Sequence, residues 1–119
     1  MNMQELATAA RYNVPLKIII LNNEYLGMVR QWQQLFRGAR YSHTWIKQGT
    51  PDFAKLANSF GIEAYKVTKQ EEVEPYLKKA MKVNDKPFLL EFKVPPEENV
   101  YPMVPAGASL SEMITGSEK

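Results

Sequence analysis

Two adjacent asparagines, Asn22 and Asn23, are the residues in this sequence whose type and position best suit binding chemistry. They follow an apolar run, residues 16–21, that is long enough to be a buried strand, and the next dozen residues have the pattern of a helix. In α/β proteins, anions and metals bind where a parallel strand ends and leads into a helix N-terminus. A side-chain amide oxygen is a neutral ligand suited to Mg²⁺ or Ca²⁺. The pattern therefore indicates a metal site with a bound anion.

The asparagine pair also has a purely structural explanation. Asparagine is favoured in turns and at helix caps, so Asn22 and Asn23 could simply end the strand and cap the following helix. The local sequence leaves both interpretations open.

Other polar residues give a weaker case for catalysis. His43 is the only histidine and could act as an acid or base, but no serine or aspartate at a suitable spacing supports that role. We expect Arg30, Arg37 and Arg40 to be exposed to solvent, and we expect Glu91, in an otherwise apolar strand, to face a sheet edge. No GxGxxG, P-loop, GxSxG or HExxH motif is present.

The elements around the asparagines alternate between helix and strand. Residues 3–12 predict a short helix, which the strand 16–21 follows. The next helix ends at Gly38 and has apolar residues at helical spacing. These residues form an apolar stripe on one face of the helix. Such a stripe more often packs into the hydrophobic core than lines a binding surface, and only its nearness to Asn23 suggests that it lines a pocket. Its members are Tyr25, Met28, Val29, Trp32 and Phe36.

The second half of the chain continues the alternation. Thr50 and Pro51 predict the start of a helix, and residues 62–67 predict a strand. A capping box of Thr68 and Glu71 predicts the next helix. Its inward face should consist of Val73, Leu77, Ala80 and Met81.

A last strand over residues 87–94 completes a run of βα units, which predicts an α/β fold with a parallel sheet. We expect two parts, an α/β domain over residues 1–94 and a proline-rich tail over residues 95–119. The tail is apolar enough to pack on a surface, and Ser109 with Glu112 predicts a final capped turn.

The bulk composition excludes several classes of function. The chain has 119 residues, 45% of them hydrophobic and 24% charged, and a net charge of +2, which gives no support for nucleic-acid or membrane-surface binding. It has no cysteine, so disulfides and thiolate metal sites are excluded. Its apolar runs are far shorter than the roughly 18–20 residues of a membrane span. We expect a soluble, cytoplasmic protein.

Four motifs occur in order along nearly the whole chain: QELATA, LNN-x-x-LGMV-x-QW, RYSHT and P-M-V-P-x-G-A-S-L. With them the chain resembles the C-terminal, thiamine-diphosphate-binding domain of the acetolactate synthase (acetohydroxyacid synthase) large, catalytic subunit. The resemblance implies a three-layer α/β/α fold with a mostly parallel sheet.

The resemblance also implies a cofactor site. Asn23 would give its side-chain oxygen to Mg²⁺ and Tyr25 its backbone carbonyl, with the metal bridging the diphosphate of thiamine diphosphate. Asn22 would shape the turn, and Gly27 and Met28 would lie against the cofactor.

For the substrate, the resemblance implies a channel formed by Met28, Trp32, Phe36 and Ala106, with the tail folding back over the active site. Trp32 would help select the second 2-keto acid, and the family's herbicide inhibitors pack there. The implied reaction belongs to branched-chain amino-acid biosynthesis: pyruvate is decarboxylated on the cofactor and added to a second pyruvate or to 2-ketobutyrate.

The family's cofactor motif begins with Gly-Asp-Gly, and only its second half, Asn-Asn, is found here. We therefore expect a C-terminal part of a longer subunit, missing the first strands of the fold and inactive alone. The catalytic glutamate would come from another domain of a neighbouring subunit, and FAD would be bound elsewhere. The complete enzyme would be a homo-oligomer with a regulatory small subunit. A missing strand would expose a sheet edge and favour self-association. The alternative is a stand-alone, non-catalytic α/β binding or assembly module.

Overall fold

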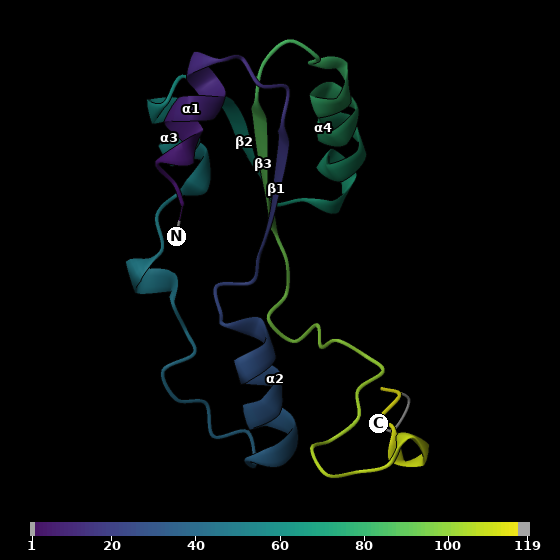
Figure 1. The fold of residues 1–119 in the computed structure, drawn as a ribbon. Helices are drawn as coiled ribbons and strands as arrows, with labels where there is room; N and C mark the ends of the chain where they lie inside the picture. The colour runs from purple at the N-terminus through teal and green to yellow at the C-terminus, as the bar shows by residue number, and fades with distance from the viewer. Residues whose placement is uncertain (1, 117–119) are drawn as a thin grey trace. The chain divides into compact units, whose positions relative to one another are not determined.

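A computed structural model describes residues 2–116 of the chain (Figure 1). The chain forms two compact units. Unit 1 comprises residues 1–24 and 47–94, and unit 2 comprises residues 25–46 and 95–119.

The helices and strands follow the predicted order. Unit 1 contains α1 (Glu5–Arg11), β1 (Lys17–Asn22), the short 3-10 helix η1 (Lys47–Gly49), α3 (Phe53–Ser59), β2 (Glu63–Val67), α4 (Gln70–Lys82) and β3 (Phe88–Lys93). Unit 2 contains α2 (Gly27–Phe36) and the 3-10 helix η2 (Leu110–Glu112). Within the described residues, no helix combines the length and the apolar character that crossing a membrane requires.

The three strands form one parallel sheet in the order β1-β3-β2, which confirms the predicted α/β class. The last strand in sequence is therefore the central one, and Leu90 of β3 is level with Ile19 of β1 and Tyr65 of β2. Residues 88–92 are all buried, as expected for a parallel strand covered on both faces.

Helices cover both faces of this sheet, so unit 1 has the three layers that the family resemblance implies (Figure 1). On one face, Leu89 packs with Ala54 and Ala57 of α3, and residues of α1 join this cluster. On the other face, Phe88, Leu90 and Phe92 pack with Ala80 of α4.

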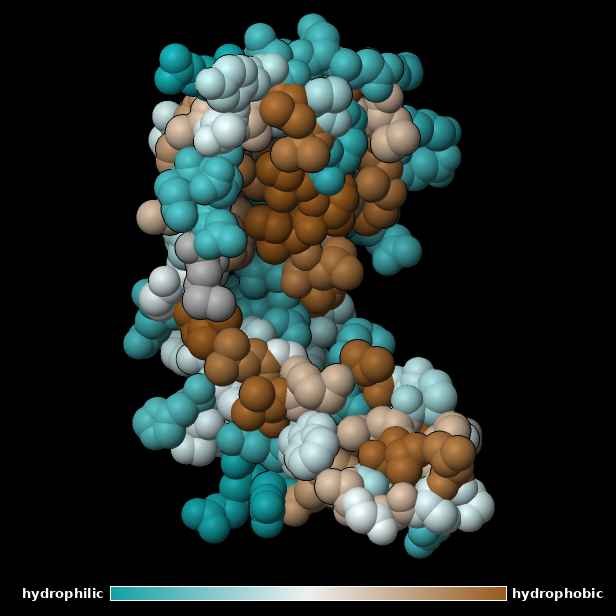
Figure 2. Space-filling view, in the orientation of Figure 1, coloured by the Kyte–Doolittle hydropathy of each residue, from teal (hydrophilic) through white to brown (hydrophobic). Residues whose placement is uncertain are grey.

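Part of the α4 face remains uncovered along the edge strand β1. Ile19 is 44% exposed and Leu21 is 69% exposed, and Leu16 just before the strand is 48% exposed. Figure 2 shows hydrophobic side chains gathered over the part of unit 1 where β1 lies, between α1 and α4 (Figure 1). We call Leu16, Ile19 and Leu21 the β1 patch.

Two predicted helix starts are wrong by one or two residues. The cap of α3 is Asp52, whose carboxylate accepts a hydrogen bond from the backbone N–H of Lys55 at 3.0 Å, so Thr50 is not the cap. Helix α4 has Lys69 at its N-cap and no side-chain cap, so Thr68 lies one residue before the N-cap and the predicted box with Glu71 does not form.

The predicted inward face of α4 is also partly wrong. Met81 is 67% exposed and Leu77 is 38% exposed. The helix contacts the core through a neighbouring stripe instead, in which Val73, Tyr76 and Ala80 follow one another at helical spacing.

Candidate functional site

The turn after β1 is held by the side chain of Asn22. Its Nδ2 donates to Glu91 Oε1 at 2.8 Å, and its Oδ1 accepts from the backbone N–H of Glu24 at 2.9 Å. Glu24 has a φ of 63°, a left-handed conformation that this side-chain turn stabilises. The structure thus agrees with the implied role of Asn22 in shaping the turn.

Neither asparagine caps a helix, contrary to the structural alternative. Helix α2 begins only at Gly27, with Leu26 at the N-cap. The helix predicted after Asn23, with Gly27 and Met28 at its start, does begin at Gly27, because the left-handed Glu24 interrupts the chain before it.

Glu91 is 1% exposed, although we expected it at a sheet edge. That expectation is wrong because β3 lies between β1 and β2 rather than beside them. The carboxylate is compensated by Asn22 and by Lys66, whose Nζ lies 3.2 Å from Oε1. Its Oε2 has no hydrogen-bond partner among the described residues. A single acid within a run of buried residues is the signal that could have revealed this charge.

A small polar pocket of about 190 Å³ lies at the carboxyl ends of β1 and β2, where α/β sheets bind ligands. The ion pair of Lys47 Nζ with Glu24 Oε1, at 3.2 Å, forms part of its wall. The pocket is lined by Asn22, Glu24, Lys47, Thr50, Pro51, Asp52 and Lys66.

The described residues contain no group of three or more histidine, cysteine, aspartate or glutamate side chains that could hold a metal ion. The oxygens that the family resemblance assigns to a metal are neutral ones, the side-chain amide of Asn23 and the backbone carbonyl of Tyr25. Such oxygens suit Mg²⁺. Asn23 follows β1 in unit 1, and Tyr25 forms an isolated antiparallel bridge with Trp45 in unit 2.

The N-terminus of α2 has the properties of an anion site. Leu26 at the N-cap makes no side-chain hydrogen bond, and the first turn contains no acidic residue. The N–H groups of Gly27 and Met28 belong to the first turn, whose amides have no acceptor within the helix, and the helix dipole favours negative charge there. The ten-residue helix therefore fits a diphosphate group at its start.

The apolar stripe on α2 is exposed within unit 2, so the expectation that it forms core is wrong there. Met28 is 51% exposed, Trp32 43% and Phe36 36%. The rings of Trp32 and Phe36 meet edge to face, with centroids 5.6 Å apart. The buried side chains of this helix are instead the polar Arg30 and Gln31.

The exposed stripe lines two hollows. One has a volume of about 450 Å³ and brings Trp32 and Phe36 together with Ala106 of the tail. The other, of about 300 Å³, is lined by Met28, Val29 and Trp32, so Trp32 borders both. The complete lining of the first hollow, which we call the tail pocket, is Val29, Trp32, Gln33, Phe36, Arg37, Pro105 and Ala106.

Arg30 is 6% exposed, so the expectation that it is solvated is wrong. Its guanidinium lies over the rings of Tyr25 and Tyr41, 5.3 Å and 4.7 Å from their centroids. It also donates to Gln34 Oε1 at 3.0 Å and lies 3.7 Å from a carboxylate oxygen of Glu97. Arginine stacks well on aromatic faces, and so the two tyrosines bury a charge that the sequence pattern assigns to solvent.

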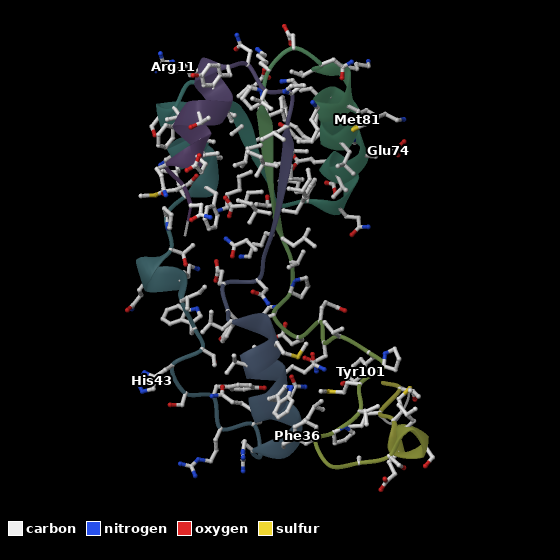
Figure 3. All side chains as sticks on the ribbon, viewed as in Figure 1. Arg11, Phe36, His43, Glu74, Met81 and Tyr101 are labelled. Atoms are coloured by element: carbon white, nitrogen blue, oxygen red, sulfur yellow. The ribbon has the colours of Figure 1, made fainter. Side chains whose placement is uncertain are left out.

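His43 is exposed on the loop after α2, with a φ of 53°, and its side chain points away from that helix (Figure 3). This position gives no support for a role in acid–base catalysis.

The model of one protein family, described as the thiamine pyrophosphate enzyme, C-terminal TPP binding domain, matches residues 1–92. The chain belongs to this family, which confirms the resemblance seen in its motifs. It is 53% identical over 114 residues to the acetolactate synthase large subunit of Porphyra purpurea, covering 96% of this chain and 19% of that protein. It is 50% identical to the acetolactate synthase isozyme 2 large subunit of Escherichia coli (strain K12), covering 96% of this chain and 20% of that protein.

Among solved structures, the fold is similar to that of a thiamine diphosphate-dependent 4-hydroxybenzoylformate decarboxylase from Rhodococcus jostii RHA1. The TM-score is 0.68 and the sequence identity 28%, over 78% of this chain and 17% of that one. The chain spans about a fifth of the length of the curated relatives it matches.

Proposed function

We propose that this chain is the C-terminal part of an acetolactate synthase large subunit and contributes part of its thiamine diphosphate and Mg²⁺ site. The identity to acetolactate synthases over 96% of the chain supports the assignment. The complete enzyme would join two 2-keto acids, pyruvate with pyruvate or with 2-ketobutyrate, in the cytoplasm. It would act as a homo-oligomer with a regulatory small subunit, and FAD would be bound outside this chain.

The observation that carries the cofactor assignment is the turn after β1. Both ends of the Asn22 amide are engaged, with Glu91 and with the backbone of Glu24, which supports its role in shaping the turn. We assign the metal to Asn23, as the family resemblance implies. The backbone carbonyl of Tyr25 is the second proposed ligand. Because Asn22 is anchored to a buried side chain, the backbone that carries Asn23 is fixed before any metal binds, which lowers the entropic cost of binding.

The remaining proposed cofactor contacts are those of the first turn of α2. The N–H groups at Gly27 and Met28 would donate to diphosphate oxygens, in keeping with the absence of a side-chain cap. Bound thiamine diphosphate supplies a carbon nucleophile that this chain's side chains do not offer. The chain's own contribution is to bind and orient the cofactor.

The tail pocket is the proposed place for the second 2-keto acid. Trp32, Phe36 and Ala106 give it apolar walls that exclude water from the substrate's alkyl end, and Met28 extends this apolar surface beyond Trp32. Arg37 supplies the one formal positive charge in the lining, suited to a carboxylate.

Titration calorimetry of the purified chain with thiamine diphosphate tests the proposal. We expect weak binding in the presence of Mg²⁺, because both proposed ligands, Asn23 and Tyr25, are neutral. EDTA and Asn23→Ala should abolish this binding. His43→Ala is the matched control and should bind as the parent chain does. Binding of thiamine diphosphate that is unaffected by removal of Mg²⁺ and by Asn23→Ala would favour the alternative, a non-catalytic module. Acetolactate formed from pyruvate by the chain alone would contradict its proposed inactivity.

A further inference from the structure

Two glutamines of α2 hold irregular segments of unit 2 in the same way. The Nε2 of Gln31 donates to the carbonyl of Val100 at 2.8 Å, and its Oε1 accepts from the N–H of Val100 at 2.9 Å. The Nε2 of Gln33 donates to the carbonyl of Ser42 at 2.9 Å, and its Oε1 accepts from the N–H of Ser42 at 3.3 Å. Each side-chain amide thus pairs with both backbone groups of one residue, as a residue in a neighbouring β-strand would.

The two pairs differ in their surroundings. Gln31 is 1% exposed, and its Nε2 also lies 3.2 Å from the sulfur of Met103 in the tail. Gln33 is only half-buried, and its Oε1 also accepts from the hydroxyl of Thr44 at 3.1 Å. Gln31 therefore holds the tail, and Gln33 holds the loop after α2.

These bonds matter because Val100 and Ser42 lie in no helix or strand. Backbone groups outside regular structure need side chains or water as partners, and a buried amide that loses its partner carries a desolvation penalty. Leaving the buried amide of Gln31 without its hydrogen-bond partner would therefore lower the stability of this part of the chain. Its two bonds fix the tail at Val100, a few residues before Pro105 and Ala106, which form one wall of the tail pocket.

We propose that Gln31 is a positioning residue that sets where the tail lies along α2, and thereby the shape of the tail pocket. Gln33 positions the loop at Ser42 independently. This assignment goes beyond the proposed function, because it holds whatever ligand the pocket takes.

Amide hydrogen exchange of the full 119-residue chain, followed residue by residue with NMR, tests the division of roles. In Gln31→Met, which keeps the length but loses the amide, we expect exchange at Val100 to accelerate by about fivefold to tenfold while Ser42 is unchanged. In Gln33→Met we expect the reverse. A general loss of stability would instead accelerate both positions in both variants, and that result would overturn the proposal.

The position of the tail needs its own measurement. Because the chain has no cysteine, Leu110→Cys gives a single attachment site for a nitroxide label, at a residue that is 78% exposed. We expect the label to broaden the amide signals of α2, and the broadening to fall in Gln31→Met but to persist in Gln33→Met. Unchanged broadening in Gln31→Met would overturn the proposal.

A matched variant covers the case in which Gln31→Met fails to fold. Gln31→Glu keeps the size and the accepting oxygen but loses the donor to the carbonyl of Val100. Exchange at Leu90, in the central strand of unit 1, and exchange along α2 in unit 2 report whether both units are intact. If Leu90 and α2 are as protected from exchange in Gln31→Glu as in the parent chain, we expect the label at position 110 to broaden the amide signals of α2 less than in the parent chain. Broadening equal to that in the parent chain would contradict the role of Gln31.

Discussion

At the scale of single residues, hydrogen bonds and ring contacts of polar side chains hold the backbone around the candidate site in place. Asn22 joins the buried Glu91 to the backbone of Glu24, and Arg30 is buried against two tyrosine rings. A buried hydrogen-bonded network gives a defined geometry, and it makes the loss of any one member costly.

Substitution of Asn22 tests this network. Asn22→Ala loses two hydrogen bonds and should lower the free energy of unfolding by about 1–3 kcal/mol. Asn22→Asp, although nearly isosteric, places a second carboxylate against Glu91 and should cost more than alanine at neutral pH. Urea unfolding measures both. An Asp variant as stable as the parent chain would show that the contact with Glu91 does not exist in solution.

The Asp variant should also respond to pH. Repulsion from the buried carboxylate of Glu91 should raise the pKa of the introduced aspartate in the folded chain above its value in the unfolded chain. The penalty is therefore present at neutral pH and shrinks as the pH falls and one carboxylate takes up a proton. A penalty that stays constant down to acid pH would rule out charge repulsion as its cause.

At the scale of elements, helix α4 is tied to strand β2 by charges as well as by apolar packing. Lys79 Nζ lies 2.9 Å from a carboxylate oxygen of Glu63, donates to the hydroxyl of Tyr65 and lies over that ring. The hydrogen bond from Lys79 holds the pKa of Glu63 below its ordinary value of 4.5. The hydroxyl of Tyr65 and then Glu63 raise the pKa of Lys79.

This lowered pKa predicts a dependence of stability on pH. The ionised Glu63 stabilises the fold above its unfolded pKa, near 4.5, and this contribution is lost as the pH falls through the lower folded value. Glu63→Gln should therefore be less stable than the parent chain at neutral pH, by a small margin because the pair is partly exposed, and equal to it at about pH 2.

Urea unfolding at several pH values checks the difference. Glu74→Gln is the matched control, since Glu74 pairs with Lys78 on the same helix with both side chains largely exposed (Figure 3). We expect the control to show almost no difference at any pH. A difference for Glu63→Gln that grows as the pH falls would contradict the assignment.

The sequence predicted the elements well and their surroundings less well. Apolar runs such as residues 16–21 and 87–94 identified strands because burial in a parallel sheet demands continuous hydrophobicity. The position of Glu91 was predicted wrongly, because it depends on β3 lying between β1 and β2, and strand order is a property of tertiary structure. The start of α2 at Gly27 agrees with the prediction, and the left-handed Glu24 is the local reason why the helix does not begin directly after Asn23.

For the candidate site, the sequence named several of the residues that line the tail pocket but not the residue that we propose positions the tail. The family resemblance assigned Trp32, Phe36 and Ala106 to one channel, and all three line the tail pocket. Gln31 is part of the LNN-x-x-LGMV-x-QW motif but was given no role, because a glutamine on a helix ordinarily indicates an exposed face. Its burial follows from Val100, which is far away in the sequence.

At the scale of the whole molecule, the chain matches about a fifth of each curated relative and leaves apolar surface uncovered on unit 1. The β1 patch lies on an edge strand, and exposed edges and apolar patches favour association. The isolated chain should therefore associate with itself at high concentration.

Leu21→Lys tests this expectation, since Leu21 is the most exposed member of the β1 patch. A charge there should reduce the apparent mass in light scattering at high concentration, with little effect on folding because the side chain makes few core contacts. Leu110→Lys, an equally exposed leucine in unit 2, is the control. A parent chain that stays monomeric at every concentration would contradict the expectation.

The central claim is that the chain carries the Asn23 part of a thiamine diphosphate and Mg²⁺ site. NMR of the isotope-labelled chain, titrated with thiamine diphosphate and Mg²⁺ together and separately, tests it most directly because it detects weak binding and locates it. We predict that the amide signals of residues 23–29 shift when both are present, and that Asn23→Ala removes the shifts. Unmoved signals over residues 23–29, or equal shifts in Asn23→Ala, would contradict the claim.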